Sequence, residues 1–280
     1  MYLTVNGARL FFDTVGSGLG LKPDRMVERP AFIVLHGGPG FDHSSMRPYF
    51  DRFADTHQVI YVDHRGNGRS GGETATWTLD QWGDDLAALC AALGLERPVV
   101  LGQSFGGMAA MAFATRHPEA IGKLILSSTA ATMRLDDTYA MMARLGGAEA
   151  ETIARRFWTE PSEAGVGDYM RVCMPLYNPA SDPEVSAALR ARAIMRTEVL
   201  FHFVVGEQRS MDFRPALGRV TTPTLILCGA LDPITPVACS EEILSALPDA
   251  RLEIFEGCGH GPHRDQPERA EAVIRHFLES

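Results

Sequence analysis

Residues 98–107 read PVVLGQSFGG, and the stretch after them, up to His117-Pro118, has a helical pattern. The apolar run 98–102 is typical of a strand buried on both faces, and residues 105–117 predict a helix that Pro118 ends. Between them lies G-x-S-x-G, a motif that sets a serine on a sharp turn from strand to helix. Gly102 and Gly106 allow the backbones to approach closely there, so we expect the Ser104 hydroxyl to stand above the edge of a sheet.

The same alternation of strand and helix extends in both directions from this turn. Apolar runs at 31–35 and 58–63 precede it, and runs at 123–128, 222–229 and 250–257 follow it. Helical spacing covers 78–93, with Thr78 as N-cap, and helices fit 236–247 and 267–279. Near the start, Asn6-Gly7 between two alternating runs predicts a β-hairpin. This order predicts an α/β fold with a mostly parallel twisted sheet and helices on both faces.

One long segment interrupts the alternation. Between 130 and 218 the buried strands stop, and the sequence is helical and rich in methionine and aromatic residues. We interpret 130–218 as a helical cap inserted over the end of the sheet. Residues 1–129 and 219–280 then form the core domain. Most of the methionine and aromatic side chains are expected to pack the cap against this core.

Composition excludes several classes of function. The 280-residue chain has a formal net charge of −9 and no Lys/Arg cluster, which argues against nucleic-acid binding. No apolar run reaches the length of a membrane span, and no signal peptide is recognisable. The five cysteines are scattered and odd in number, as expected for reduced thiols in a cytoplasmic protein. The oligomeric state stays open.

The position of Ser104 predicts where partners for a nucleophilic serine should lie. A serine nucleophile needs a base, and the base needs an acid that orients it. In a parallel sheet these residues belong in loops after later strands, in the order Ser, Asp, His. Asp232 follows the run 222–229 and His260 follows the run 250–257. We therefore predict Ser104 as nucleophile, Asp232 as acid and His260 as base, with His263 as the alternative base.

The loop after the first buried strand reads His36-Gly37-Gly38-Pro39-Gly40. Acyl transfer needs N–H donors aimed at the oxygen that becomes negative, and the backbone amides of Gly38 and Phe105 are the predicted pair. His36 is expected to hold the loop. Cys258 lies near the base, which predicts sensitivity to thiol reagents. No metal is expected at Cys258, His260 and His263, because a fourth ligand is lacking, and no cofactor is implied.

The motifs HGGPG (36–40), DHRGNGRS (63–70), GQSFGG (102–107), LDPITP (231–236) and GCGHGPHRDQPE (257–268) together resemble the proline iminopeptidase branch of the α/β-hydrolase fold. The resemblance implies removal of an N-terminal proline or another residue from short peptides, with acidic residues holding the free α-amino group. Residues 195–203, MRTEVLFHF, resemble the acid-bearing cap segment of that family. This makes Glu198 the first candidate for substrate binding and Glu207 the second, although Glu198 equally fits a solvated helix face.

The combined prediction is a serine hydrolase that forms an acyl-enzyme on a small-molecule or short-peptide substrate. An aminopeptidase is the first hypothesis. A carboxylesterase or lactone hydrolase for small apolar substrates is the alternative, because the cap is rich in methionine and aromatic residues. A binding protein that has lost turnover is a third reading, which the complete set of Ser104, Asp232 and His260 makes the weakest.

Overall fold

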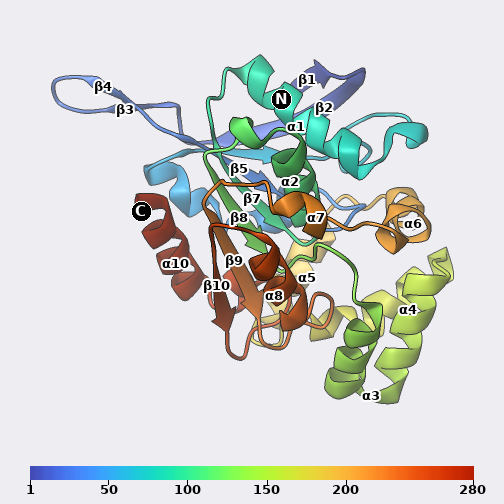
Figure 1. Cartoon of the computed structure of the whole chain (residues 1–280). Helices are drawn as coiled ribbons and strands as arrows, with labels where there is room; N and C mark the ends of the chain where they lie inside the picture. Colours follow the sequence, from blue (N-terminus) through green and yellow to red (C-terminus); the bar gives the residue numbers. More distant parts are fainter.

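The computed structural model describes all 280 residues, and an eight-stranded sheet forms its centre (Figure 1). The strands lie in the order β1-β2-β6-β5-β7-β8-β9-β10. The six strands from β6 to β10 run parallel, and β2 joins β6 antiparallel. Their bounds are β1 Tyr2–Val5, β2 Ala8–Val15, β5 Ala31–Leu35, β6 Gln58–Val62, β7 Val99–Gln103, β8 Lys123–Ser127, β9 Thr224–Gly229 and β10 Ala250–Phe255. The predicted α/β fold with a mostly parallel sheet is confirmed.

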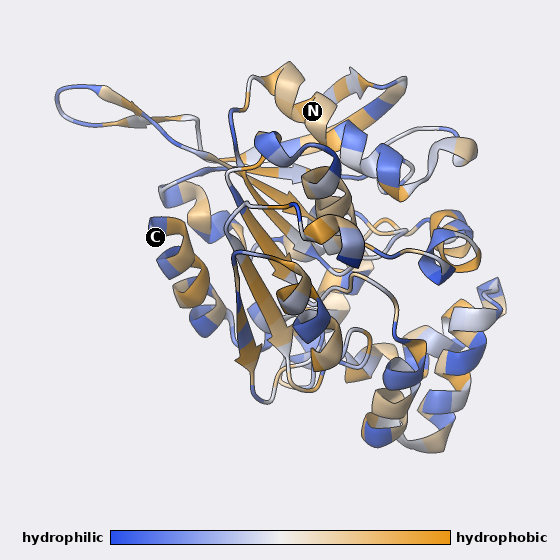
Figure 2. Ribbon diagram, in the orientation of Figure 1, coloured by the Kyte–Doolittle hydropathy of each residue, from blue (hydrophilic) through white to orange (hydrophobic).

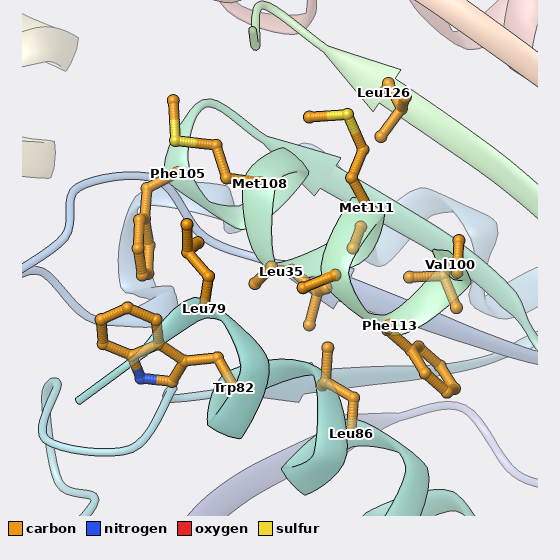
Figure 3. Packing of buried hydrophobic residues seen from close by; sticks show 14 of the residues in the cluster. Leu35, Leu79, Trp82, Leu86, Val100, Phe105, Met108, Met111, Phe113 and Leu126 are labelled. Atoms are coloured by element: carbon orange, nitrogen blue, oxygen red, sulfur yellow. The ribbon is translucent and has the colours of Figure 1, made fainter. Parts of the chain in front are cut away.

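Each central strand is apolar on both faces because helices cover both. In β5, Ile33 and Leu35 face one core cluster, and Phe32 and Val34 face the other. The first cluster includes side chains of five helices, and Figure 3 shows part of it. These helices are α1 Leu79–Leu93, α2 Phe105–Arg116, α6 Thr197–Val205, α7 Arg214–Leu217 and α8 Val237–Ala246. The second cluster includes α10 Pro267–Glu279 and the short 3-10 helices His43–Met46 and Asp51–Asp55. Figure 2 shows the resulting apolar sheet with hydrophilic stretches on the surrounding helices.

The strand order places a crevice beside Ser104. β5 pairs with both β6 and β7. The strand that follows β5 in the chain therefore lies on one side of it, and the next strand lies on the other side. In open α/β sheets ligands bind at the carboxyl ends of strands at such a switch point. The loop that begins at His36 follows β5 there, and Ser104 follows β7.

Between β8 and β9 the chain is helical. The helices are α3 Leu135–Thr159, α4 Glu163–Val172, α5 Pro183–Arg192 and α6 Thr197–Val205, followed by α7. α3 and α4 pack side by side and enclose a small core of their own, which includes Phe157, Trp158 and Tyr169 (Figure 1). α6 differs, because Val199 and Phe203 belong to the main core. The segment is therefore attached to the sheet domain through α6.

The structure has a second, two-stranded sheet, for which the sequence analysis predicts no strands. β3 (Leu19–Leu21) pairs with β4 (Met26–Glu28), and the hairpin projects away from the body in Figure 1. Leu21 is 82% exposed and Met26 is 52% exposed. Strands of three residues that bury so little carry no periodic pattern in the sequence. No helix of this structure is both long and apolar enough to span a lipid bilayer.

Candidate active site

Ser104 occupies a strained turn between β7 and α2. Its φ of 55° and ψ of −122° lie in a region that residues other than glycine seldom adopt. The backbone is held on both sides, because Ser104 N–H donates to Ser127 O at 2.9 Å and Ser104 O accepts from Thr129 Oγ1 at 2.7 Å. A side chain on Gly102 would overlap the backbone of Gly106. The close approach expected of these two glycines is therefore present.

The structure brings Ser104, His260 and Asp232 into one chain of hydrogen-bond contacts. Ser104 Oγ lies 2.8 Å from His260 Nε2. On the other side of the ring, His260 Nδ1 lies 2.9 Å from each carboxylate oxygen of Asp232. All three residues are buried, and Ser104 retains 8% exposure. The backbone N–H of His260 donates to the carbonyl of Tyr177, at an N···O distance of 2.5 Å.

Asp232 is fixed by its own loop. Its Oδ1 accepts from the backbone N–H groups of Ile234 at 2.8 Å and Thr235 at 2.9 Å, and its Oδ2 accepts from Thr235 Oγ1 at 3.1 Å. These three hydrogen bonds fix the position of the carboxylate, and that position orients the His260 ring.

The two predicted oxyanion donors lie on either side of Ser104. Gly38 lines the same cavity as Ser104, and Phe105 is the first residue of α2. Neither backbone N–H donates to another group of the protein. The Gly38 loop is braced by Gly40 N–H, which donates to Asn67 Oδ1 at 2.6 Å. His36 Nε2 accepts from His64 N–H at 3.3 Å, and burial lowers the pKa of His36. This residue is thus a neutral support for the loop.

A cavity of about 400 Å³ opens above Ser104 and His260. The sheet domain contributes Phe41, Ile234 and Arg264 to its wall. The helices between β8 and β9 and their connections contribute the larger share, mainly Phe157, Trp158, Tyr169, Met170, Met174, Tyr177, Asn178, Leu189, Arg190 and Leu200. Twenty-six residues line the cavity, and none of them is an aspartate or a glutamate. Its only permanently charged lining groups are guanidinium groups.

The structure does not bring the two predicted substrate-binding glutamates to this cavity. The Glu198 side chain is 57% exposed and its nearest cation is Arg196 at 3.7 Å, because α6 turns its apolar residues inward and leaves Glu198 on the outer face. Glu207 instead accepts from the N–H of Leu79 at 2.6 Å, at the start of α1. Burial raises the pKa of Glu207. The motif similarity around 195–203 gave no information on which side of α6 meets the cavity.

Two other expectations from the C-terminal loop need correction. His263, the alternative base, is buried against Tyr49 and Phe50, and neither of its ring nitrogens has a partner. Cys258 has no exposed surface, and burial raises the pKa of its thiol to about 11. A buried thiol that stays protonated does not react readily, contrary to the expected sensitivity to thiol reagents.

Sequence reasoning missed Arg264 and Arg190. Arg264 lies four residues after His260, in the one-turn helix α9 (Pro262–Asp265), so its proximity to the base gave a usable signal. Arg190 comes from α5, and no pattern in the sequence relates it to the sheet.

The parallel sheet, the serine on the turn after β7 and the Asp and His in the loops after β9 and β10 define an α/β-hydrolase. Residues 28–267 match the family described as serine aminopeptidase, S33, and the chain belongs to that family of serine hydrolases.

Three relatives illustrate the range of activities around this chain. Proline iminopeptidase PfmaB of Pestalotiopsis fici is 27% identical over 287 residues, which cover 99% of each chain. The crystal structure of proline iminopeptidase from Mycobacterium smegmatis is 26% identical, with a TM-score of 0.80 over 100% of this chain and 97% of that one. A thermophilic esterase from Thermogutta terrifontis, solved with malate bound, is 27% identical, with a TM-score of 0.74 over 99% and 96% of the two chains. Peptidase and esterase relatives are thus similarly distant.

Proposed function

We propose that Ser104, His260 and Asp232 form a catalytic triad that hydrolyses a small carboxylic ester or lactone through an acyl-enzyme. The observation that supports the triad is the unbroken line of contacts, 2.8 Å from Ser104 Oγ to His260 Nε2 and 2.9 Å from His260 Nδ1 to Asp232. The free N–H groups beside Ser104 supply the second requirement of acyl transfer, a site for the developing negative oxygen.

In this mechanism His260 Nε2 takes the proton of Ser104 as Oγ attacks the substrate carbonyl. The N–H groups of Gly38 and Phe105 stabilise the tetrahedral oxyanion, and Asp232 stabilises the imidazolium. The bond to the leaving alcohol then breaks, and His260 gives that alcohol its proton. Water repeats the sequence: His260 takes a proton from water, hydroxide oxygen attacks the acyl-enzyme, and Ser104 recovers its proton as the acid leaves.

The cavity wall favours an ester or lactone over a peptide with a free amino end. An ammonium group that leaves water needs a carboxylate or several acceptors to offset the cost of desolvation. No carboxylate lines this cavity, and the charges present are those of Arg190 and Arg264. The apolar lining from Phe41, Phe157 and Leu200 suits the carbon skeleton of a small acyl group. We also propose that residues 130–218 act as the cap that completes this cavity.

Aminopeptidase activity is the second candidate. It is favoured by the family to which the chain belongs and by relatives named as proline iminopeptidases. The substrate would then need its ammonium group outside the lined cavity or bound by carbonyl oxygens alone.

Hydrolysis of three compounds tests the two candidates: p-nitrophenyl butyrate, proline-linked aminocoumarin and its N-acetylated form, each with wild type and Ser104→Ala. We expect the butyrate to be hydrolysed and the activity to be lost in Ser104→Ala. Cleavage of the free-amine coumarin alone would instead establish the aminopeptidase. If a fluorophosphonate probe labelled no serine and no compound reacted, the triad proposal itself would fail.

A further inference from the structure

Arg264 presents a cation to the cavity and has no anionic partner within the protein. It lines the cavity together with Ser104 and His260. The only hydrogen bond of its side chain is a long one, 3.4 Å from Nη2 to the carbonyl of Ser45. Its Nε is buried without any partner, and no carboxylate lies within salt-bridge distance. Burial lowers the pKa of Arg264, yet an arginine in a protein stays protonated. The Arg264 guanidinium therefore has N–H groups that are free to donate hydrogen bonds to a ligand in the cavity.

Two further arginines, Arg190 and Arg192, increase the positive charge near Arg264. Arg190 of α5 also lines the cavity. Two residues later, Arg192 donates to the carbonyls of Ser44 and Arg47, on the same short segment that Arg264 contacts through Ser45. The charges of Arg190 and Arg192 both lower the pKa of Arg264, which reflects mutual repulsion. Arg192 and Arg264 therefore reach the same segment, and Arg190 lies close enough to Arg264 to repel its charge, in a chain whose net charge is −9.

The nearest acid does not neutralise this cluster. Asp265 follows Arg264, but its Oδ2 accepts from the N–H of Gly259 at 2.7 Å and from Asn178 Nδ2 at 3.3 Å. That carboxylate therefore holds the His260 loop and makes no ion pair with Arg264.

We propose that the substrate carries a carboxylate group, bound by the Arg264 guanidinium with support from Arg190, while its ester or lactone carbonyl lies at Ser104. This inference rests on the proposed function, since it names the substrate class of the same site. Arginine suits this task because its planar donors match the two oxygens of a carboxylate. Hydrolysis then breaks the bond between the acyl carbon and the leaving oxygen, water supplies the hydroxyl and the proton, and one product carries the bound carboxylate.

Two matched pairs of esters test the proposal and distinguish the acyl from the leaving-group side. The first pair is mono-p-nitrophenyl adipate and p-nitrophenyl hexanoate, which differ by a carboxylate on the acyl chain. The second is 4-acetoxybenzoate and 4-acetoxybenzamide, which differ by a carboxylate on the leaving phenol. The quantity compared is the ratio of kcat/KM, charged over neutral, within each pair. Rates with Ser104→Ala give the spontaneous hydrolysis to subtract.

We expect wild type to prefer the charged member of one pair, and Arg264→Met to lower that ratio by about tenfold or more, as for loss of a charged hydrogen bond. Arg264→Lys should keep part of the preference. Arg219→Met, which removes an exposed arginine outside the cavity, should keep all of it. If Arg264→Met does not fold, inhibition of wild type by adipate but not by hexanamide supplies the same evidence.

A ratio of one or less in both pairs, with the neutral esters hydrolysed in a Ser104-dependent way, would overturn this inference and leave the proposed function intact. Equal loss of preference in Arg264→Met and Arg219→Met would also overturn it. Absence of any hydrolysis, together with no fluorophosphonate labelling of Ser104, would overturn the proposed function instead.

Discussion

At the scale of single residues, the site combines a strained serine with a fully supported aspartate. A residue other than glycine in the φ region of Ser104 costs about 1–3 kcal/mol, which the surrounding fold must offset. The contacts of Ser104 with Ser127 and Thr129 show where β8 and its following loop hold it. Asp232 has no positive φ, and its own loop donates three hydrogen bonds to it. Among Ser104, Asp232 and His260, positive φ is thus confined to Ser104.

Replacing Asp232 by Asn tests the role of the acid. The amide keeps the shape of the side chain but lacks the charge that stabilises the imidazolium and selects the ring tautomer. We expect kcat for p-nitrophenyl butyrate to fall on the order of 10³–10⁴-fold with little change in KM. Asp212→Asn, at an exposed residue paired with Arg214, is the control and should leave kcat unchanged. A loss below tenfold in Asp232→Asn would contradict the proposed triad.

Cys258 offers a second test at this scale. Because the thiol is buried and its pKa is raised to about 11, very little thiolate exists at pH 7–8. We expect treatment with iodoacetamide to leave esterase activity unchanged and mass spectrometry to find Cys258 unmodified in the folded enzyme. Unfolding in urea should expose all five cysteines to the reagent, which controls for its reactivity. Rapid inactivation of the folded enzyme would show that the loop around His260 opens.

At the scale of elements, the sheet and the helical character of 130–218 were predictable, but the orientation of the helices in that segment was not. The runs at 31–35 and 222–229 are apolar throughout, since helices cover both faces, and such runs differ clearly from any surface segment. The order Ser104, Asp232, His260 followed from that sheet. The orientation of α6 depends on contacts with distant residues, so the sequence left open whether Glu198 faces the cavity or the solvent. For the same reason, the sequence did not predict that α5, with Arg190, forms part of the cavity wall.

Gly259 precedes His260 and lies against Tyr177, and this close contact yields a third prediction. A methyl group at this position would overlap the carbonyl of Tyr177, which accepts the N–H of His260. Gly259→Ala should therefore displace the base and lower kcat/KM by about a hundredfold or more, as expected for misplacement by about 1 Å. The matched control is Gly167→Ala in α4, where nothing lies within 4 Å and alanine favours the helix by roughly 1 kcal/mol. Equal kinetics in both variants would contradict the role of this contact.

At the scale of the whole molecule, buried charged residues of the loop 63–70 form hydrogen bonds with residues of other segments. Asp63 accepts from His43 Nδ1 at 2.6 Å and from the N–H groups of His43 at 3.0 Å and Arg69 at 2.9 Å. Burial raises the pKa of this carboxyl, but the hydrogen bonds from the His43 ring and the Arg69 N–H act in the opposite direction, and the pKa is lowered to about 2. Arg65 and Asp85 form a second buried pair, with N···O distances of 2.7 Å.

Because the pKa of Asp63 is lowered in the folded state, the free energy of unfolding depends on pH in the acid range. The unfolded pKa is about 3.9 and the folded one about 2, so the stabilisation is complete above pH 4 and is lost as pH falls through 2. It amounts to roughly 2–3 kcal/mol. We expect Asp63→Asn to lower the free energy of unfolding in urea at pH 7, and its difference from wild type to shrink between pH 4 and pH 2. A difference independent of pH would refute this; Asp24→Asn, at an exposed residue, is the control.

The hydrogen bond from His260 to Tyr177 also limits how this protein can be modified or can have diverged. The segment 130–218 is not an independent module, because its Tyr177 carbonyl accepts the backbone N–H of His260. A chimera that received residues 130–218 from another hydrolase would acquire a new specificity only if the graft reproduced that carbonyl beside Gly259. Otherwise we expect the chimera to fold with a complete cavity wall but an unreactive Ser104, because His260 would be displaced. Recombination in this lineage should therefore preserve a short segment around Tyr177 even where the remainder of the cap has been exchanged.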